Sequence, residues 1–385
     1  MKELSKVVEG FKESIFATLS KKARKNEAIN LGQGFPDFDG PAWIIDLAKK
    51  ALDKGEQHVN QYAPFEGVMP LREAISKNYQ KYYNLDYDPQ TEITVVNGAT
   101  EAIFSTILAI VNPGDEVIIF EPFYDSYLAS IKLAGGIPVP VTLKTREFNW
   151  DLNELKEAFS SKTKLVILNS PHNPTGKIFS TNEVEELGTL LKKHDAYLMS
   201  DEVYEFLVFG ENKHIPPATH AGLKERTITI SSIGKTFGLT GWKIGWTCAP
   251  KHLTHAIRMV HQFNTFSVNQ PIQHAVAEAL EKMDDYLPEF RALYQKKRDY
   301  FLEGMKKCGY DPIEPQGTYF VMVPIETHTT LEDVGYCMEL IETRKVASIP
   351  PSAFYIKGDE GKKYLRFCFA KKDETLQNAL ENLSR

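Results

Sequence analysis

Cysteine is scarce in this sequence, since its 385 residues include only four. The four lie far apart and form no Cys-x-x-Cys pair. Four widely separated thiols suit a reduced cytosolic protein better than the dense disulfide framework of a secreted domain or a zinc site. The pattern therefore predicts reduced thiols, no metal site and a cytoplasmic location. The four residues are Cys248, Cys308, Cys337 and Cys368.

Long apolar runs, an excess of basic residues and internal repeats are also missing. No apolar run reaches the length that spans a bilayer, and the polar start Met1–Lys6 lacks the apolar core of a signal peptide. Lys and Arg number 45 against 51 Asp and Glu, a net charge of -6, whereas nucleic-acid binding relies on a basic surface. We therefore expect a soluble protein with neither a membrane nor a nucleic acid as partner.

What the sequence does contain is a succession of β-branched and apolar runs separated by helical patterns. Runs typical of buried strands begin near residues 93, 117, 165, 196 and 227, and a helical pattern such as Thr181–Lys193 lies between two of them. This alternation predicts an α/β fold with a mainly parallel sheet and crossover helices. Ligands of open α/β sheets bind at the carboxyl ends of the strands, so residues that follow each strand are candidates for a site.

Lys235 follows one of these runs, in the segment Ser232-Ile-Gly-Lys-Thr-Phe-Gly-Leu-Thr-Gly-Trp-Lys243. The pattern predicts a strand that breaks at Gly234 and places Lys235 in a glycine-rich turn beside apolar side chains and Lys243. Burial and a like charge lower the pKa of a lysine and free its amine as a nucleophile for carbonyls. The alternative is an ordinary surface lysine. A phosphate-binding P-loop is excluded, because Thr229 stands where that motif requires a glycine.

A second strand, beginning at residue 93, runs through Asn-Gly-Ala-Thr-Glu into a long apolar helix. Free backbone N–H groups and the positive end of the helix dipole favour an anion there. Gly98, Ala99 and Thr100 are therefore candidates for holding a phosphate. A glycine between a strand and a helix is common in α/β proteins, so this feature alone is weak support, and the dinucleotide fingerprint Gly-x-Gly-x-x-Gly is missing here.

Four further residues each allow more than one interpretation. Tyr124 can stack on a flat ligand or pack in the core, and Asn173 can contact a ligand or cap a turn. Asp201 ends an apolar strand, where a carboxylate needs a partner. That partner can be a protonated ring nitrogen, or the residue can cap a helix or form a salt bridge. Arg366 lies between apolar strand residues and requires an anion, either a substrate carboxylate or a structural one.

Together these motifs resemble the fold-type I pyridoxal-phosphate aminotransferases of class I and II. The resemblance runs from Asn30 to Arg366 and includes Ser-x-x-Lys, Thr-Gly-Trp-Lys, Gly-Gln-Gly-Phe-Pro-Asp-Phe, Asn-Gln-Tyr and Pro-His-Asn-Pro. The motifs are most similar to the branch of methionine, kynurenine and glutamine–phenylpyruvate aminotransferases. That branch also has a lysine, here Lys243, where aspartate-type enzymes have arginine.

The fold that the resemblance implies has a large domain with a mainly parallel, seven-stranded-type sheet and a smaller α+β domain built from both termini. Residues 1–45 would be an N-terminal arm and part of the small domain, residues 46–280 the large cofactor-binding domain and residues 281–385 the small C-terminal domain. In the arm, Phe11, Ile15, Phe16 and Leu19 lie at helical spacing. We also expect helices at 41–53, 71–83 and 271–307, and alternating strands at 317–323 and 364–369.

For the cofactor, pyridoxal 5′-phosphate, the resemblance implies one role for each motif residue. Lys235 forms the Schiff base, and Asp201 and Tyr204 hold the ring nitrogen and the phenolic oxygen; these three form the catalytic group. Tyr124 stacks on the ring, and Asn173 also faces the phenolic oxygen. The phosphate is held by Gly98, Ala99, Thr100, Ser232 and Lys243. Tyr62 reaches the phosphate of the neighbouring subunit, which implies a homodimer with shared active sites.

For the substrate, the resemblance implies a second set of contacts. Arg366 grips the α-carboxylate, Gly34 lines the carboxylate pocket and Asn173 lies beside it. Phe16 and Phe266 contact the substrate, Phe266 from the partner subunit, although apolar packing is the alternative for Phe266.

The expected activity is transfer of the amino group of a neutral apolar or aromatic L-amino acid, methionine being favoured, to a 2-oxo acid. No second basic residue awaits a side-chain carboxylate, which is why a neutral side chain is expected. A kynurenine or glutamine–phenylpyruvate aminotransferase and a cysteine-conjugate β-lyase are alternatives on the same scaffold. A ligand-sensing regulator is a third, but it would need a DNA-binding module for which we find no spare segment or basic patch.

Overall fold

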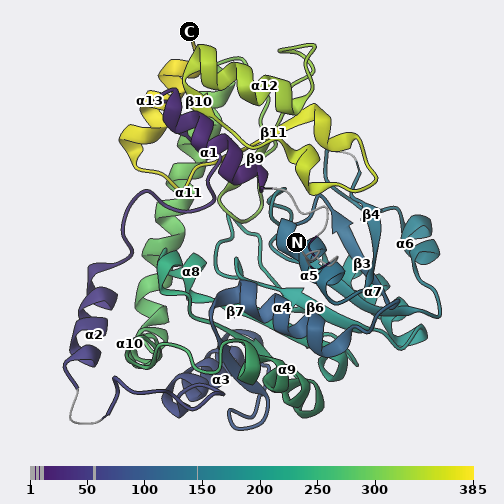
Figure 1. Cartoon of the computed structure of the whole chain (residues 1–385). Coiled ribbons are helices and arrows are strands. Elements are labelled where there is room, and N and C mark those ends of the chain that lie inside the picture. The colour runs from purple at the N-terminus through teal and green to yellow at the C-terminus, as the bar shows by residue number, and fades with distance from the viewer. Residues whose placement is uncertain (1–4, 6–7, 9–12, 55–57, 145) are drawn as a thin grey trace, which may run out of the picture.

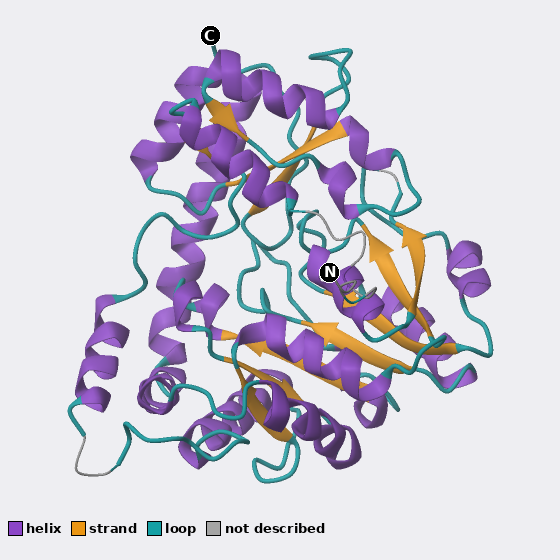
Figure 2. Ribbon diagram, viewed as in Figure 1, coloured by secondary structure: helices purple, strands orange, loops and turns teal. Residues whose placement is uncertain are grey.

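A computed structural model describes residues 5, 8, 13–54, 58–144 and 146–385. Its centre is a seven-stranded sheet of order β2-β8-β7-β6-β5-β3-β4 (Figures 1 and 2). Neighbouring strands are parallel except at β8, which is antiparallel to both β2 and β7. The expected mainly parallel α/β fold is thereby confirmed. The strands are β2 (Ile93–Val96), β3 (Glu116–Glu121), β4 (Ile137–Thr142), β5 (Thr163–Asn169), β6 (Tyr197–Asp201), β7 (Thr227–Ser232) and β8 (Gly245–Cys248).

Both faces of this sheet are covered by helices. On β3, Val117 and Ile119 belong to one apolar layer, and Ile118 and Phe120 belong to the other. Because side chains alternate across a strand, covering both faces requires apolar residues at every position. This explains the continuous apolar runs in the sequence. Helices α4 (Gly98–Ile110), α5 (Asp125–Leu133) and α9 (Lys251–Asn264) contribute to the first layer, and α6 (Leu152–Ala158) and α7 (Thr181–Lys193) to the second.

A smaller part of the molecule, at the top of Figure 1, combines segments from both ends of the chain. Strand β9 (Phe320–Pro324) pairs antiparallel with β11 (Tyr364–Cys368), and β1 (Ile29–Asn30) pairs parallel with β10 (Val346–Ala347). Helix α1 (Ile15–Lys25) therefore lies among C-terminal elements (Figure 1). The other helices of this part are α12 (Asp333–Glu339) and α13 (Asp373–Leu383). The proposed boundaries at residues 45 and 280 stay a prediction.

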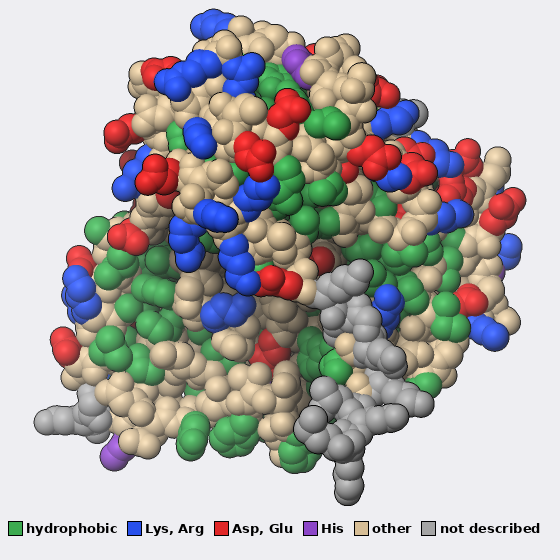
Figure 3. All heavy atoms as spheres, turned by 45° about the horizontal axis from the view of Figure 1, so that its top comes forward, with side chains coloured by type: hydrophobic (Ala, Val, Ile, Leu, Met, Phe, Trp, Pro, Cys, Tyr) green, Lys and Arg blue, Asp and Glu red, His purple; other side chains and the backbone are tan. Residues whose placement is uncertain are grey.

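The remaining helices connect the two parts. Helix α10 (Gln270–Leu280) packs against α2 (Ala42–Leu52) and α3 (Met69–Tyr83), and the 25-residue helix α11 (Met283–Lys307) runs from there towards the top of the molecule (Figure 1). Among the residues that the structure describes, no helix is both long and apolar enough to cross a membrane. On the face drawn in Figure 3, acidic and basic side chains are interspersed.

Three expectations about local structure need correction. Lys235 lies in a single helical turn, α8 (Ile233–Thr236), rather than in a glycine-rich turn. The helical stretch 271–307 is interrupted between α10 and α11. Strands β9 and β11 do not alternate, because four of the five residues in each are buried, on both faces. Phe11 lies outside the described residues, whereas the other three apolar residues of its pattern lie on α1.

Candidate active site

A pocket with a volume of about 340 Å³ lies at the carboxyl ends of the central strands, between the sheet and β11. All but two of the residues that the sequence singled out line it. The lining residues among them are Phe16, Gly34, Gly98, Ala99, Thr100, Tyr124, Asn173, Asp201, Tyr204, Ser232, Lys235, Lys243 and Arg366. The two that lie elsewhere are Tyr62 and Phe266.

Lys235 projects into this pocket from α8, directly after β7. Its Nζ donates hydrogen bonds to the Tyr319 hydroxyl at 2.9 Å and to the Gly34 carbonyl oxygen at 3.3 Å. Burial lowers the pKa of the Lys235 amine to about 8, and the charges of Arg366 and Lys243 act in the same direction. The free amine is therefore much more populated at neutral pH than it is for an exposed lysine, as a carbonyl-attacking group requires.

Asp201 ends β6 on the floor of the pocket. The Tyr127 hydroxyl donates to its Oδ2 at 2.6 Å, and the Val203 backbone N–H donates to its Oδ1 at 3.4 Å. Burial raises the pKa of the Asp201 carboxyl to about 6, although the hydrogen bond from Tyr127 opposes that rise. Its described hydrogen-bond donors are thus a phenol and an amide rather than a cation. A buried carboxylate in this state attracts a protonated ring nitrogen.

At the start of α4, the pocket has groups that favour an anion. Helix α4, 13 residues long, begins at Gly98 with a positive φ of 76°, and a Cβ at Gly98 would lie 3.2 Å from Lys243 Nζ. Gly245 on β8 brings that strand so close that a Cβ there would lie 2.8 Å from the Ala99 nitrogen. Two glycines thus let a lysine ammonium approach the positive end of a helix. Such a site suits a phosphate dianion.

A buried pair behind this helix start was not anticipated from the sequence. Glu101 accepts a hydrogen bond from the Asn97 backbone N–H, and its other oxygen lies 2.6 Å from Nδ1 of His261 on α9. The Nε2 atom of His261 lies 2.7 Å from the Phe65 carbonyl oxygen. These contacts fix the first turn of α4 and hold the Glu101 carboxylate against Asn97 and His261.

Arg366 lies at the other side of the pocket and is only 1% exposed. Its Nη1 donates to Asn173 Oδ1 at 2.9 Å and its Nη2 to the Gly32 carbonyl oxygen at 2.9 Å, while its Nε has no hydrogen-bond partner among the described residues. The Phe320 ring lies 4.1 Å from the guanidinium carbon. Burial lowers the pKa of this guanidinium to about 10.

The described contacts of Arg366 are therefore an amide oxygen, a carbonyl oxygen and aromatic rings, not a carboxylate. The structural salt bridge considered as an alternative is not formed within the described chain. A buried guanidinium with an unpaired N–H is instead well suited to a carboxylate that arrives with a ligand.

Three aromatic residues predicted from the sequence shape the space between these groups. Tyr204 meets the Tyr319 ring edge-on at 5.4 Å, and Phe16 lies 5.2 Å from the guanidinium carbon of Arg366. Tyr124, at the start of α5, meets Tyr127 edge-on at 5.7 Å. The cavity thus has flat aromatic walls between its anion-binding end and Arg366.

Tyr62 and Phe266 lie together, away from this pocket. Their rings meet edge-on at 5.5 Å, and they are 81% and 46% exposed. Phe266 has a positive φ of 67°, in the segment between α9 and α10. Within a single chain neither side chain lines the pocket that contains Lys235.

Several pocket residues carried no signal in the sequence. Tyr127, Asp125, Asn169 and Phe320 line the cavity, and Tyr319 contacts Lys235. An aromatic residue in an apolar segment is indistinguishable from core packing until its neighbours are known. Tyr127 alone could have been suspected from its spacing. It lies three residues after Tyr124 where a helix follows a strand, and this spacing places both side chains on the same face of the helix.

Comparisons with known proteins point to one family of enzymes. The family model of the class I and II aminotransferases matches residues 26–383. The chain is 42% identical to a kynurenine–oxoglutarate transaminase of Dictyostelium discoideum, over 98% of this chain and 95% of that protein. It is 41% identical to a methionine aminotransferase of Escherichia coli, over 96% and 95% of the two chains. A solved Escherichia coli structure with a methionine aminotransferase function is similar at a TM-score of 0.95, with 39% identity over 100% of this chain and 99% of that one.

Proposed function

Because this chain belongs to the class I and II aminotransferases, we propose that it transfers the amino group of a neutral, apolar or aromatic L-amino acid to a 2-oxo acid, with methionine as the favoured donor. The class of enzyme follows from the family, and its members depend on pyridoxal phosphate. The choice of donor is our inference from the pocket.

The residues of the pocket fit this cofactor. We assign the phosphate to the start of α4, to Ser232 and to Lys243, where the positive helix end and the ammonium converge. The ring nitrogen is assigned to Asp201, whose buried carboxyl has no described cationic partner. Asn173 and Tyr204 would face the phenolic oxygen, and Tyr124 would lie against the ring; all three line the pocket. Lys235 would hold the aldehyde carbon.

In this arrangement each residue has a separable task. Bound pyridoxal phosphate supplies an electron sink that stabilises negative charge at the substrate Cα. The free Lys235 Nζ would take the Cα proton as a base and return it as an acid. Asp201 keeps a positive charge at the ring nitrogen, and Arg366 holds the substrate carboxylate so that the Cα–H lies near Lys235.

The observation that carries the choice of a neutral donor is the distribution of charge in the pocket. Its described lining contains three basic side chains, those of Lys235, Lys243 and Arg366. Each already has a task, so none is left for a carboxylate on the substrate side chain. The lining near Arg366 is aromatic, with Phe16 and Phe320, and favours apolar side chains.

The test is the absorption spectrum of the purified protein during titration with L-methionine. We expect the visible band of lysine-bound cofactor to be replaced by the band of its aminated form, with an equimolar amount of 2-oxo acid. L-aspartate, whose side chain carries a carboxylate, should act far more weakly. If L-methionine leaves the visible band unchanged while L-kynurenine bleaches it, the second candidate, a kynurenine aminotransferase like the relative of 42% identity, replaces the first.

We further propose that the enzyme is a homodimer in which Tyr62 and Phe266 complete the partner's pocket. Their exposure, 81% and 46%, and their mutual contact support this, because contiguous exposed apolar side chains are typical of protein–protein contact sites. Tyr62 would then contact the phosphate, and Phe266 the substrate, of the other subunit.

Subunit complementation tests the shared site. Lys235→Ala and Tyr62→Ala would each reduce activity, but a mixed dimer of the two has one intact site. Random co-assembly should therefore restore about a quarter of wild-type activity. The control pairs Lys235→Ala with Arg366→Gln, which belong to the same site and should not complement. Equal recovery in both mixtures, or none in the first, would contradict a shared site.

A further inference from the structure

The amine of Lys235 has two hydrogen-bond acceptors that no described role explains. Its Nζ lies 2.9 Å from the Tyr319 hydroxyl oxygen and 3.3 Å from the Gly34 carbonyl oxygen. Tyr319 has no assigned role in holding the phosphate, the ring nitrogen or the substrate carboxylate. Gly34 is expected to line the carboxylate pocket, but that role does not explain why its carbonyl oxygen faces Lys235. Tyr319 is 1% exposed and directly precedes β9, 84 positions after Lys235 in the sequence.

The direction of these hydrogen bonds is fixed by Tyr319 itself. Its hydroxyl donates to the Gly34 carbonyl oxygen at 2.6 Å, so its single proton is already used. The hydroxyl oxygen can then only accept from Lys235. The Gly34 carbonyl has no proton and also only accepts. Both neighbours of the amine are therefore acceptors.

A neutral primary amine has two N–H groups and one lone pair. If both N–H groups are directed at Tyr319 and Gly34, the lone pair points away from them, into the cavity. We propose that Tyr319 and the Gly34 carbonyl orient the released amine of Lys235, so that its lone pair faces the Cα–H of the bound amino acid. Tyr319 is thus a positioning residue, which acts through Lys235. This inference rests on the proposed function of Lys235 as the proton-transfer base.

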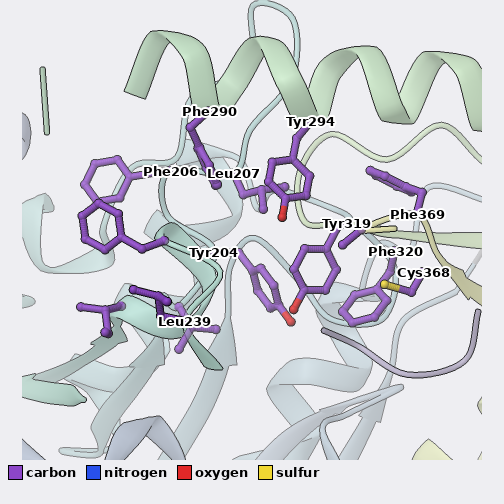
Figure 4. Packing of buried hydrophobic residues seen from close by; sticks show 14 of the residues in the cluster. Tyr204, Phe206, Leu207, Leu239, Phe290, Tyr294, Tyr319, Phe320, Cys368 and Phe369 are labelled. Carbon is purple, nitrogen blue, oxygen red and sulfur yellow. The ribbon is translucent and has the colours of Figure 1, made fainter. Parts of the chain in front are cut away.

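Both acceptors are themselves held firmly. Tyr319 meets Tyr204 edge-on at 5.4 Å and Phe320 at 4.9 Å, and it stacks on Tyr294 at 6.2 Å. Figure 4 shows the hydroxyls of Tyr204 and Tyr319 directed to the same point, at the end of this aromatic cluster. A ring fixed on three sides cannot turn its hydroxyl away from the amine without disturbing the core.

The Gly34 carbonyl is fixed by its neighbours in the loop. The carbonyl oxygens of Gln33 and Phe35 both accept hydrogen bonds from Lys371 Nζ, at 3.2 and 2.8 Å, and that of Gly32 accepts from Arg366 at 2.9 Å. A Cβ at Gly34 would lie 2.7 Å from the Phe320 ring, so only glycine fits. Consecutive carbonyl groups of this loop are thereby held in place, so the Lys235 amine meets an acceptor in a fixed position.

Tyr319→Phe tests the proposal, because it removes one oxygen and keeps the ring. The control is Tyr294→Phe, which removes a phenol from the same cluster without a contact to Lys235. The first measurement uses the full chain freed of cofactor, with acetylation of Lys235 followed against pH by mass spectrometry. An ammonium donates a stronger hydrogen bond than an amine, so loss of the acceptor should lower the pKa of Lys235 by about half a unit to one unit.

The second measurement uses the holoenzyme. We expect Tyr319→Phe to lower kcat about tenfold, with KM within about twofold, and to raise the kinetic isotope effect of α-deuterated methionine, because a poorly oriented amine slows proton transfer itself. A reactivity profile and isotope effect equal to those of the wild type, or equal changes in Tyr294→Phe, would overturn the proposal. If the wild type fails to transaminate, the proposed function falls, but the cofactor-free measurement still decides the role of Tyr319.

Discussion

Replacing Lys235 with alanine is expected to reduce transamination by about 10³- to 10⁴-fold, the contribution of a positioned proton-transfer base. The substitution removes an amine whose pKa is lowered to about 8 and whose Nζ lies 2.9 Å from Tyr319. The contacts that we assign to the phosphate and ring are left in place, so the variant should still bind pyridoxal phosphate. It should do so without the visible band of lysine-bound cofactor. Stopped-flow absorbance with L-methionine measures both effects.

A second buried lysine provides the control for this experiment. Lys297 is 6% exposed and donates to the Lys371 carbonyl oxygen at 2.7 Å, outside the pocket. Lys297→Met should keep the visible band and most of the activity. A small primary amine added to Lys235→Ala should restore part of the lost rate, because it can supply the missing base. Full turnover by Lys235→Ala without added amine would refute the assignment.

Replacing Arg366 with glutamine is expected to lower kcat/KM for every amino acid donor by about 10²- to 10³-fold, the loss of two hydrogen bonds to a charged group. The guanidinium is buried, has an unpaired N–H and faces the cavity beside Asn173. Arg366→Lys keeps the charge but cannot form two parallel hydrogen bonds, so it should recover only part of the loss. Steady-state kinetics with L-methionine and L-phenylalanine give the measurement.

Two features separate a role in binding the substrate from a role in folding. The visible cofactor band of Arg366→Gln should match that of the wild type, because no cofactor contact is assigned to this residue. Arg298 is the matched control, since it is also buried, at 7% exposure, and bonds to the Pro315 carbonyl oxygen away from the pocket. Arg298→Lys should leave kcat/KM within about threefold. An equal loss in both variants would point to a structural effect.

Much of this site could be predicted because parallel strands end at one edge of a sheet. Asp201, Asn173 and Ser232 each follow an apolar run, and the alternation of strands and helices already placed those ends together. The resemblance to a family then gave each residue a role. The order of the motifs along the chain was sufficient to assign these roles, since the fold brings those positions to the same pocket.

Other contacts depend on long-range packing that no local pattern contains. Arg366 donates to Asn173 across 193 positions of sequence. Tyr319 and Tyr127 look like ordinary core aromatics until Lys235 and Asp201 are placed beside them. The expected alternation of β9 and β11 was wrong for a related reason, because these strands are covered on both faces and so read like central strands.

The order of synthesis sets the time at which this pocket can exist. Strand β8 must emerge before β2 can pair in the sheet, and β11, which carries Arg366, emerges later still. At typical elongation rates, roughly ten seconds separate β8 from β11 on the ribosome. On the roles proposed above, the residues that bind the phosphate are therefore synthesised before Arg366, which binds the carboxylate of the amino acid. A nascent chain could capture the cofactor while it is still unable to select a substrate.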